Sequence, residues 1–306
     1  MCGIVGLYLK NLELETQLGE LFSPMLASMS ERGPDSAGFA IYGDEVPGDQ
    51  IKITLQHEDT AFDWAGVARA IGEELEHQPV WFQNATAAVF KLKTSETMAR
   101  EYFARLAPEA MIMSVGRSIE ILKGVGLPQE IIERFNLPSM QGTHIIGHTR
   151  MATESAVSMA GSHPFSTGMD LCLVHNGSLS NYNWLRMRLQ KYGIHFETEN
   201  DSEVAAGYLT WRLREGDTLE QALKAGLKDL DGFYTFAIGT RDGFAVIRDP
   251  IACKPAVLAE TNDYVAMASE YRALVHLPNI ENARVWEPEP ARVYVWERGS
   301  KLGMVA

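Results

Sequence analysis

The sequence is poor in cysteine and has no closely spaced cysteine pair. Its three cysteines, Cys2, Cys172 and Cys253, lie far apart, which excludes a Cys-x-x-Cys zinc or redox motif. An odd number of cysteines without such a pair also argues against a disulfide framework. It favours a reducing compartment, so we expect a cytoplasmic protein. No His-Glu-x-x-His motif or similar spacing of histidines and carboxylates indicates a metal site.

Basic residues and long apolar runs are also scarce. Lysine and arginine number 27 against 40 aspartates and glutamates, which gives a net charge of −13. This charge repels phosphate backbones and anionic lipids, so we expect neither nucleic acid nor a membrane as a partner. No run approaches the ~20 apolar residues of a membrane span, and the first residues lack the basic start of a signal peptide.

The remaining composition is that of an ordinary globular protein. Hydrophobic residues make up 46% and charged residues 22% of 306 residues, enough for one large domain or two small ones. No repeat, low-complexity tract or Ser/Gly linker divides the chain. The stretch at 123–126 lacks the Gly-Lys-Ser/Thr ending of a phosphate loop, and no Gly-x-Gly-x-x-Gly motif opens a βα unit. No cofactor is therefore expected on this chain.

Periodicity predicts a mixture of strands and helices. Short apolar runs with glycine at 3–9 and 37–42 are typical of buried strands. Apolar residues at helical spacing predict an amphipathic helix over 18–29. Two more helices are expected at 203–213, capped by Asp201 or Ser202, and at 218–230, capped by Thr218. Further strands are expected at 144–148, 171–175, 233–239, 244–247, 265–268 and 291–296. This content suggests sheets covered by helices, without choosing a topology.

Cys2 has the most distinctive position in the chain. It becomes the N-terminal residue when an aminopeptidase removes Met1, so that a thiol and a free α-amine share one residue. An α-amine titrates near ~8 and a cysteine thiol near ~8.5, which matches the amine to accept the thiol proton. Cys2 is therefore a candidate nucleophile that carries its own base. The alternative is a cysteine that merely belongs to a buried strand.

Several short segments follow the opening MCGIVG in a fixed order. They are RGPDSAG at 32–38, GHTRMAT at 147–153, HNGSLSN at 175–181, ENDSEV at 199–204, RDPIACKP at 248–255 and ASE at 268–270. In this order they resemble the signatures of the class II glutamine amidotransferases, a family of N-terminal nucleophile hydrolases. The last two segments resemble the glutamate-synthase and phosphoribosyl-transferring branches. The resemblance covers the chain apart from about 49–113.

The resemblance implies an α+β fold, the four-layer αββα sandwich of N-terminal nucleophile hydrolases. In this fold two antiparallel sheets stack face to face, and Cys2 begins an inner strand. A single domain is expected over 1–306, or 2–306 after removal of Met1. We predict that the segment at about 49–113 is an insertion, with an interaction surface as its role.

The resemblance also implies how glutamine is cleaved. Cys2 attacks the side-chain amide and forms a γ-glutamyl thioester. The Asn176 side chain and the Gly177 backbone N–H form the oxyanion hole. Asn-Gly is also the commonest hairpin-turn dipeptide, and we expect a turn there in either case. His148, His163 and His175 are expected to pack near the site rather than to act in catalysis, because the α-amine supplies the base.

Four further residues are implied to bind substrate or to shape the site. Arg150 holds the α-carboxylate of glutamine through its planar guanidinium, and Thr153 helps. Asp201 binds the α-ammonium group, and Arg32 braces the loop beside the nucleophile. A structural ion pair is the alternative role for Arg150, and a helix cap is the alternative role for Asp201.

The expected function is hydrolysis of L-glutamine to L-glutamate and ammonia. Relatives usually carry a second domain that consumes the ammonia. For this chain we expect a separate synthase subunit, with a flavin or iron–sulfur cluster on that partner. Two alternatives remain. One is a hydrolase of another amide, for which Arg150 and Asp201 would have no use. The other is a catalytically silent scaffold or regulatory subunit, which retention of Met1 would favour.

Overall fold

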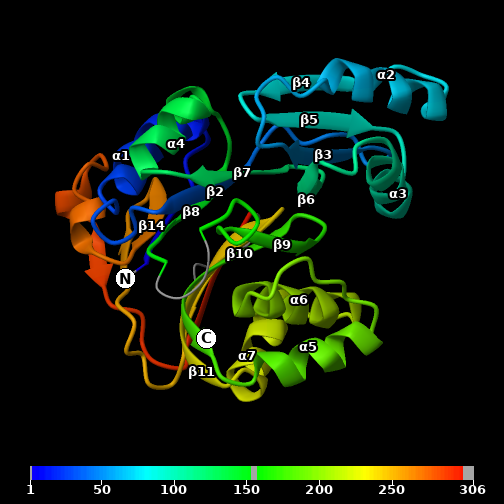
Figure 1. Ribbon diagram of the computed structural model, residues 1–306. Helices are drawn as coiled ribbons and strands as arrows, with labels where there is room; N and C mark the ends of the chain where they lie inside the picture. The colour runs from blue at the N-terminus through cyan, green and yellow to red at the C-terminus, as the bar shows by residue number, and fades with distance from the viewer. Residues whose placement is uncertain (1, 153–156, 299–306) are drawn as a thin grey trace.

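Two antiparallel sheets stack at the centre of the molecule, which the computed structural model describes over residues 2–152 and 157–298 (Figure 1). The first has seven strands in the order β15-β13-β14-β1-β8-β2-β7, and the second has five in the order β16-β12-β11-β10-β9. The strands of the first sheet are β1 (Gly3–Leu9), β2 (Ser36–Tyr42), β7 (Ile119–Val125), β8 (His144–Arg150), β13 (Val257–Glu260), β14 (Tyr264–Ala268) and β15 (Arg284–Trp286). Those of the second are β9 (Phe165–Gly168), β10 (Leu171–Leu179), β11 (Gly232–Thr240), β12 (Gly243–Arg248) and β16 (Val293–Glu297).

Strand β1 is buried on both faces, which explains its uninterrupted apolar sequence. Ile4 and Tyr8 face the second sheet, whereas Val5 and Leu7 face the helices outside. Gly6 allows the two sheets to approach closely, because a Cβ at this position would lie 2.8 Å from the Phe244 ring of β12.

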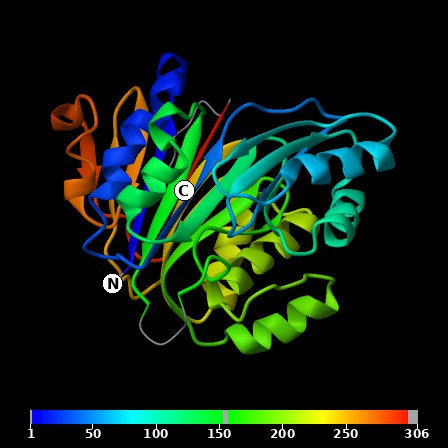
Figure 2. The same cartoon turned by 45° about the horizontal axis from the view of Figure 1, so that its top comes forward.

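Helices cover both outer faces of the paired sheets (Figures 1 and 2). Outside the first sheet lie α1 (Leu18–Ala27) and α4 (Pro128–Arg134); outside the second lie α5 (Tyr182–Lys191), α6 (Asp201–Arg214) and α7 (Leu219–Asp229). Short 3₁₀ helices occur at Leu12–Gln17, Leu137–Ser139, Tyr271–Ala273 and Ile280–Asn282. These four layers confirm the predicted αββα sandwich. None of the helices in the described part of the chain is both long and apolar enough to cross a lipid bilayer.

The predicted helices and strands are present, with small differences at their ends. The Thr218 side chain caps α7 as predicted, by accepting a hydrogen bond from the backbone N–H of Gln221. The cap of α6 was wrongly assigned, because the Asn200 side chain accepts from the Ser202 N–H. The side chains of Asp201 and Ser202 do not cap the helix. They make hydrogen bonds with Leu179 and His175 of β10 instead.

A third sheet of four strands packs beside the sandwich (Figure 2). Its strands, in the order β4-β5-β3-β6, are β3 (Ile51–Gln56), β4 (Val80–Asn84), β5 (Ala87–Leu92) and β6 (Met111–Gly116). Helices α2 (Trp64–Leu75) and α3 (Glu96–Leu106) share a separate apolar core with it, built around Trp64, Phe90 and Phe103. This unit spans the segment that lacks the family resemblance, and its origin as an insertion stays a prediction.

A buried ion pair fastens the third sheet to the first. Lys52 of β3 is fully buried, and its Nζ lies 2.9 Å from the Glu120 carboxylate of β7 and 2.8 Å from the Gly43 carbonyl oxygen. The adjoining turn is held by Asp170, whose carboxylate accepts from the backbone N–H groups of Arg117 and Ser118 at 2.8–2.9 Å. These contacts hold the third sheet in a defined orientation against the sandwich.

We expect Lys52→Met to lower the free energy of unfolding by roughly 3–5 kcal/mol, because Glu120 then stays buried without its countercharge. The double variant Lys52→Met/Glu120→Leu should recover most of this loss, since neither charge has to be desolvated. Urea unfolding followed by tryptophan fluorescence measures both. Lys93→Met is the matched control, because its pair with Asp49 is solvent-exposed and its loss should leave stability unchanged. A single variant as stable as the parent would contradict the role of this pair.

Candidate active site

Cys2 and Arg150 lie at the same end of the first sheet. The antiparallel register pairs Gly3 of β1 with Thr149 of β8, so the next positions outward are Cys2 and Arg150. Arg150 is also paired with Ser36 of β2, and its side chain is 8% exposed. The register of three strands therefore brings the candidate nucleophile next to the arginine predicted to hold the substrate carboxylate.

The backbone carbonyl of Cys2 accepts two hydrogen bonds from side chains remote in sequence. Arg32 Nε donates at 3.0 Å, from the segment after α1, and Asn176 Nδ2 donates at 3.2 Å, from β10 of the second sheet. Cys2 itself is half-buried. The amide predicted for the oxyanion hole thus lies at the residue predicted to be the nucleophile, and the two sheets meet there.

The turn expected at Asn176–Gly177 was wrong. Both residues lie inside β10, where they pair with Thr235 and Tyr234 of β11. The long pairing with β11 outweighs the turn preference of the dipeptide. Gly177 nevertheless needs to be glycine, because its φ is +151° and a Cβ would lie 1.9 Å from the Phe233 carbonyl oxygen.

Arg32 is held by a carboxylate that sequence reasoning missed. Its Nη1 lies 2.6 Å from Glu270 Oε1, and this hydrogen bond is the main reason why the Glu270 pKa falls below its ordinary value. The neighbouring Ser269 exchanges hydrogen bonds of 2.9 Å with the backbone of Ile4 in β1. The ASE segment therefore anchors both the strand that follows Cys2 and the arginine that contacts Cys2. The ASE motif at 268–270 was the sequence signal that could have pointed to Glu270.

Asp201 contacts β10 from the first turn of α6. Its Oδ2 accepts from the backbone N–H of Leu179 at 2.8 Å, and its Oδ1 lies 3.8 Å from His175 Nδ1. Ser202 Oγ lies 2.9 Å from the same His175 nitrogen. The side chain of Asp201 stays 21% exposed, so part of its carboxylate remains accessible to a ligand.

Three buried histidines pack against one another where β8 and β10 meet. Burial lowers the pKa of His148 to about 3 and that of His175 to about 4, and it lowers the pKa of His163 strongly. His148 Nε2 lies 3.0 Å from the His175 carbonyl oxygen, and the rings of His148 and His163 stack at 4.0 Å. Uncharged at neutral pH, these rings pack together, and His148 and His175 also make hydrogen bonds, whereas neither ring nitrogen of His163 has a hydrogen-bond partner among the described residues.

The segment at 248–255 adjoins the candidate site, because the Lys254 carbonyl oxygen accepts a hydrogen bond from Thr235 Oγ1 at 3.4 Å and Thr235 is paired with Asn176. Arg248 is 6% exposed and donates to the carbonyl oxygens of Ala252, Lys254 and Pro288, which fixes the loop. The pKa of His175 is lowered first by burial and then, against the opposing effect of Asp201, by the charge of Lys254. Lys254 therefore lies within electrostatic reach of the candidate site, a position that the motif alone did not reveal.

The other cysteines and possible metal ligands contribute little here. Cys172 is fully buried, and burial raises the pKa of its thiol to about 12; Cys253 is exposed. Within residues 2–152 and 157–298, no group of three or more His, Cys, Asp or Glu side chains could hold a metal ion. Thr153, predicted to help bind the substrate carboxylate, lies outside the described residues.

The predicted residues thus gather from five parts of the chain. Cys2, Arg32 and Asn176 are joined by hydrogen bonds, Arg150 is adjacent through strand register, and Asp201 contacts β10 two residues beyond Gly177. This arrangement combines a half-buried thiol residue, a side-chain amide donor, an arginine and a partly exposed carboxylate.

Comparisons with known proteins agree with this geometry. A family model described as "Glutamine amidotransferase domain" matches residues 148–276. The "Glutamine amidotransferase-like protein GlxB" of Rhizobium meliloti is 56% identical over 97% of this chain and 98% of its own length. The amidophosphoribosyltransferase of Methanocaldococcus jannaschii is 31% identical over 54% of this chain and 36% of its own.

A solved structure supports the same fold. The glutamine phosphoribosylpyrophosphate amidotransferase of B. subtilis matches 97% of this chain with a TM-score of 0.62 and 21% identity, and this chain spans 47% of its length. The match to GlxB over nearly the full length of both chains, the family model and the shared fold support the same assignment. The chain belongs to the glutamine amidotransferase family, and it has the αββα fold expected for the class II, N-terminal nucleophile members of that family.

Proposed function

We propose that this protein hydrolyses L-glutamine to L-glutamate and ammonia, with Cys2 as the nucleophile. The observation that carries the proposal is the pair of hydrogen bonds from Arg32 and Asn176 to the Cys2 carbonyl, because it puts an amide donor beside the thiol residue. After removal of Met1, the free α-amine of Cys2 takes the thiol proton. The thiolate then attacks the carbonyl carbon of the glutamine side chain.

The tetrahedral intermediate carries a negative oxygen that needs donors. The Asn176 side-chain amide and the Gly177 backbone N–H are the groups assigned to it, and they stand on the central part of a paired strand. Such rigid donors stabilise developing charge without reorganising. The Cys2 ammonium returns its proton to the departing nitrogen, so ammonia leaves and a γ-glutamyl thioester remains. Water then cleaves the thioester and releases glutamate.

The amino-acid end of glutamine is assigned to two opposite charges. Arg150 offers a planar guanidinium to the α-carboxylate, with Thr153 beside it, and Asp201 offers its partly exposed carboxylate to the α-ammonium. The two bind from different elements, β8 and α6, so they fix the direction in which the side chain extends. An amide without an amino-acid head would use neither, which argues against a general amide hydrolase.

We further propose that the protein is the glutaminase subunit of a cytoplasmic multi-chain amidotransferase. The ammonia would pass to an acceptor site on a separate synthase subunit that carries a flavin or an iron–sulfur cluster. Support comes from the 248–255 and 268–270 segments, which resemble the glutamate-synthase branch, and from the match over 98% of GlxB, which leaves little of that relative outside the shared region. A catalytically silent subunit is the competing function, and it would require that the α-amine of Cys2 stay blocked.

Cys2→Ala should abolish glutamine hydrolysis, and Cys2→Ser should leave only a trace, because a hydroxyl is a far weaker nucleophile at pH 7 than a thiol with a few per cent thiolate. Glutamate release, measured after intact-mass analysis has verified loss of Met1, tests this. Cys253→Ala is the matched control and should keep full activity, since that thiol is exposed on the 248–255 loop. Glutamate release by Cys2→Ala at the wild-type rate would contradict the proposed mechanism.

Arg150→Lys should raise KM for glutamine by about tenfold or more, because a point charge cannot make the paired hydrogen bonds of a guanidinium to a carboxylate. Asp201→Asn should act in the same direction through the lost ion pair with the α-ammonium. Steady-state kinetics measure both, with Arg188→Lys, an exposed residue of the outer helix α5, as the control. Unchanged glutamine kinetics in both variants, together with impaired turnover of a simple amide, would favour the general amide hydrolase.

The isolated chain should hydrolyse glutamine slowly and should speed up with its partner, because a partner that prefers the competent conformation shifts its population. Purification of the tagged chain from its native host, followed by glutaminase assays with and without co-purified proteins, tests the subunit role. A chain that captures no synthase and already works at full rate alone would contradict it.

A further inference from the structure

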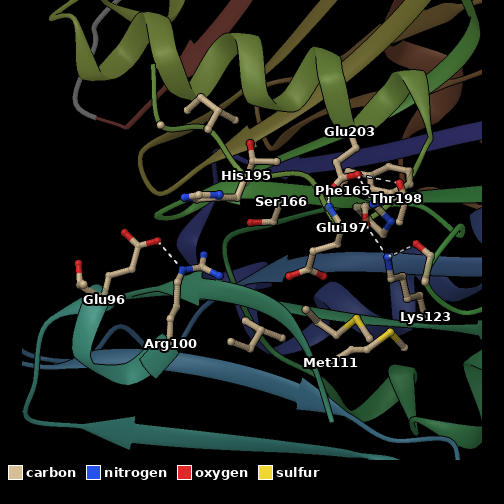
Figure 3. Close-up of a pocket in the computed structure, with 18 of the residues that line it drawn as sticks. Glu96, Arg100, Met111, Lys123, Phe165, Ser166, His195, Glu197, Thr198 and Glu203 are labelled. Carbon is tan, nitrogen blue, oxygen red and sulfur yellow. Dashed lines mark hydrogen bonds and ion pairs between the residues drawn. The ribbon is translucent and has the colours of Figure 1, made fainter. Parts of the chain in front are cut away.

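A cavity of about 370 Å³ lies where the third sheet meets the second sheet and α6 (Figure 3). Residues of α3 and β6 form one side, β9 and the loop at 193–198 form the other, and Lys123 of β7 closes the back. Its volume is in the ~300–1,000 Å³ range of small-molecule sites. None of the residues assigned to the glutamine site lines the cavity, although Glu203, which does, comes two residues after Asp201 on α6.

Two charged groups in the wall are already satisfied by the protein. The buried Lys123 Nζ donates to the carbonyl oxygens of Ser162 at 2.8 Å and Pro164 at 3.3 Å, and burial lowers its pKa to about 8. The Glu203 carboxylate accepts from the backbone N–H groups of Glu197 and Thr198, each at 2.8 Å. These two residues build the wall and leave little capacity for a ligand.

Glu197 and Arg100 remain available, and they project into the cavity from opposite sides (Figure 3). Within the described part of the chain, no group donates a hydrogen bond to the Glu197 carboxylate. Its surroundings, first by burial and then by the charge of Glu203, raise its pKa, although the cavity mouth keeps the side chain in contact with water. Arg100 uses Nε for Glu96 at 2.9 Å, which leaves the other guanidinium N–H groups for a ligand.

The rest of the wall is mainly apolar on the side of the third sheet. Met111 and Met113 of β6, Phe165 of β9 and Ile194 all line the cavity. Methionine side chains adapt to ligands of varied shape. Ser166 and His195 lie between the two charged groups and supply further polar contacts (Figure 3).

We propose that this cavity is a second ligand site, which binds a small zwitterion: a free α-amino acid with an apolar side chain. The carboxylate of the ligand binds the Arg100 guanidinium, and its ammonium binds Glu197. The side chain lies against Met111, Met113 and Phe165.

The charges select this class over simpler ions. An anion without an ammonium group would meet Arg100 but also face Glu197 and Glu203. An amine without a carboxylate would satisfy Glu197 and leave the guanidinium donors without an acceptor. A ligand with both groups pairs Arg100 and Glu197 at once. Arg214 and Glu101 also line the cavity and add one charge of each sign, so the wall as a whole favours a zwitterion over a simple ion.

Calorimetric titration of the full chain with L-leucine tests the proposal, with isoamylamine and 4-methylpentanoate as probes that each lack one charged group. Leucine should bind, and each probe should bind about tenfold more weakly or worse, because one charge-assisted contact is lost. Equal binding of either probe, or no binding of leucine at millimolar concentration, would overturn the zwitterion site.

Variants assign the binding to this cavity. Glu197→Gln and Arg100→Gln should each weaken leucine binding by about tenfold. The matched controls are Glu199→Gln, whose side chain is 92% exposed, and Arg105→Gln, which lies on α3 like Arg100 but pairs with Glu74 of α2. Both controls should bind leucine normally, and the unfolding midpoints of all four variants should match the parent.

The glutamine site could also accept leucine, and one more variant separates the two. Arg150→Lys should leave leucine binding unchanged, because Arg150 does not line the cavity. Binding that is lost in Arg150→Lys but kept in Glu197→Gln and Arg100→Gln belongs to the glutamine site and overturns the proposal.

Discussion

The carbonyl oxygen of Cys2 joins parts of the protein that are far apart in sequence, and the candidate site is organised around it. Arg32 reaches it from the segment after α1, and Asn176 reaches it from the second sheet. Glu270 in turn holds Arg32, and Ser269 holds the backbone of β1. An exposed chain terminus ordinarily frays. Here the strand pairing of β1 on both sides and these side-chain contacts fix the residue that has to act as a nucleophile.

The stacking of the two sheets is a precondition for that contact. Gly6 lets the Phe244 ring lie directly on β1, and Gly177 lets β10 pass close to the Phe233 carbonyl. A side chain at either position would push the strands apart and would move Asn176 away from Cys2. Packing inside the sandwich therefore controls the geometry of the site, because the donors and the nucleophile belong to different sheets.

Charge is distributed unevenly between the two sites that the structure contains. At the candidate glutamine site, burial keeps three histidines neutral, so the formal charges there belong to arginine, lysine and carboxylate side chains. In the cavity beside the third sheet, backbone hydrogen bonds occupy the donors of Lys123 and the acceptors of Glu203, and Glu197 and Arg100 keep their capacity for a ligand. The two sites share α6 and the segment before β9, so they lie on a common framework.

The sequence alone was sufficient for the local features and for the family. Apolar periodicity located α1, α7 and most of the central strands, because burial on one or both faces leaves a direct mark on residue order. Ordered motifs identified Cys2, Arg32, Arg150, Asn176, Gly177 and Asp201 as the candidate site. These residues belong to short segments whose chemistry can be recognised one segment at a time.

Tertiary structure decided whatever depends on partners remote in sequence. Asn176–Gly177 carries a strong turn signal, yet pairing with β11 keeps it within a strand, and no local pattern reports that pairing. Asn200 rather than Asp201 caps α6, because Asp201 finds a better partner in the Leu179 N–H of β10. The role of Glu270, the proximity of Lys254 and the cavity between Glu197 and Arg100 arise only when separate elements meet. Strand register and sheet stacking create those contacts, and both are properties of the whole fold.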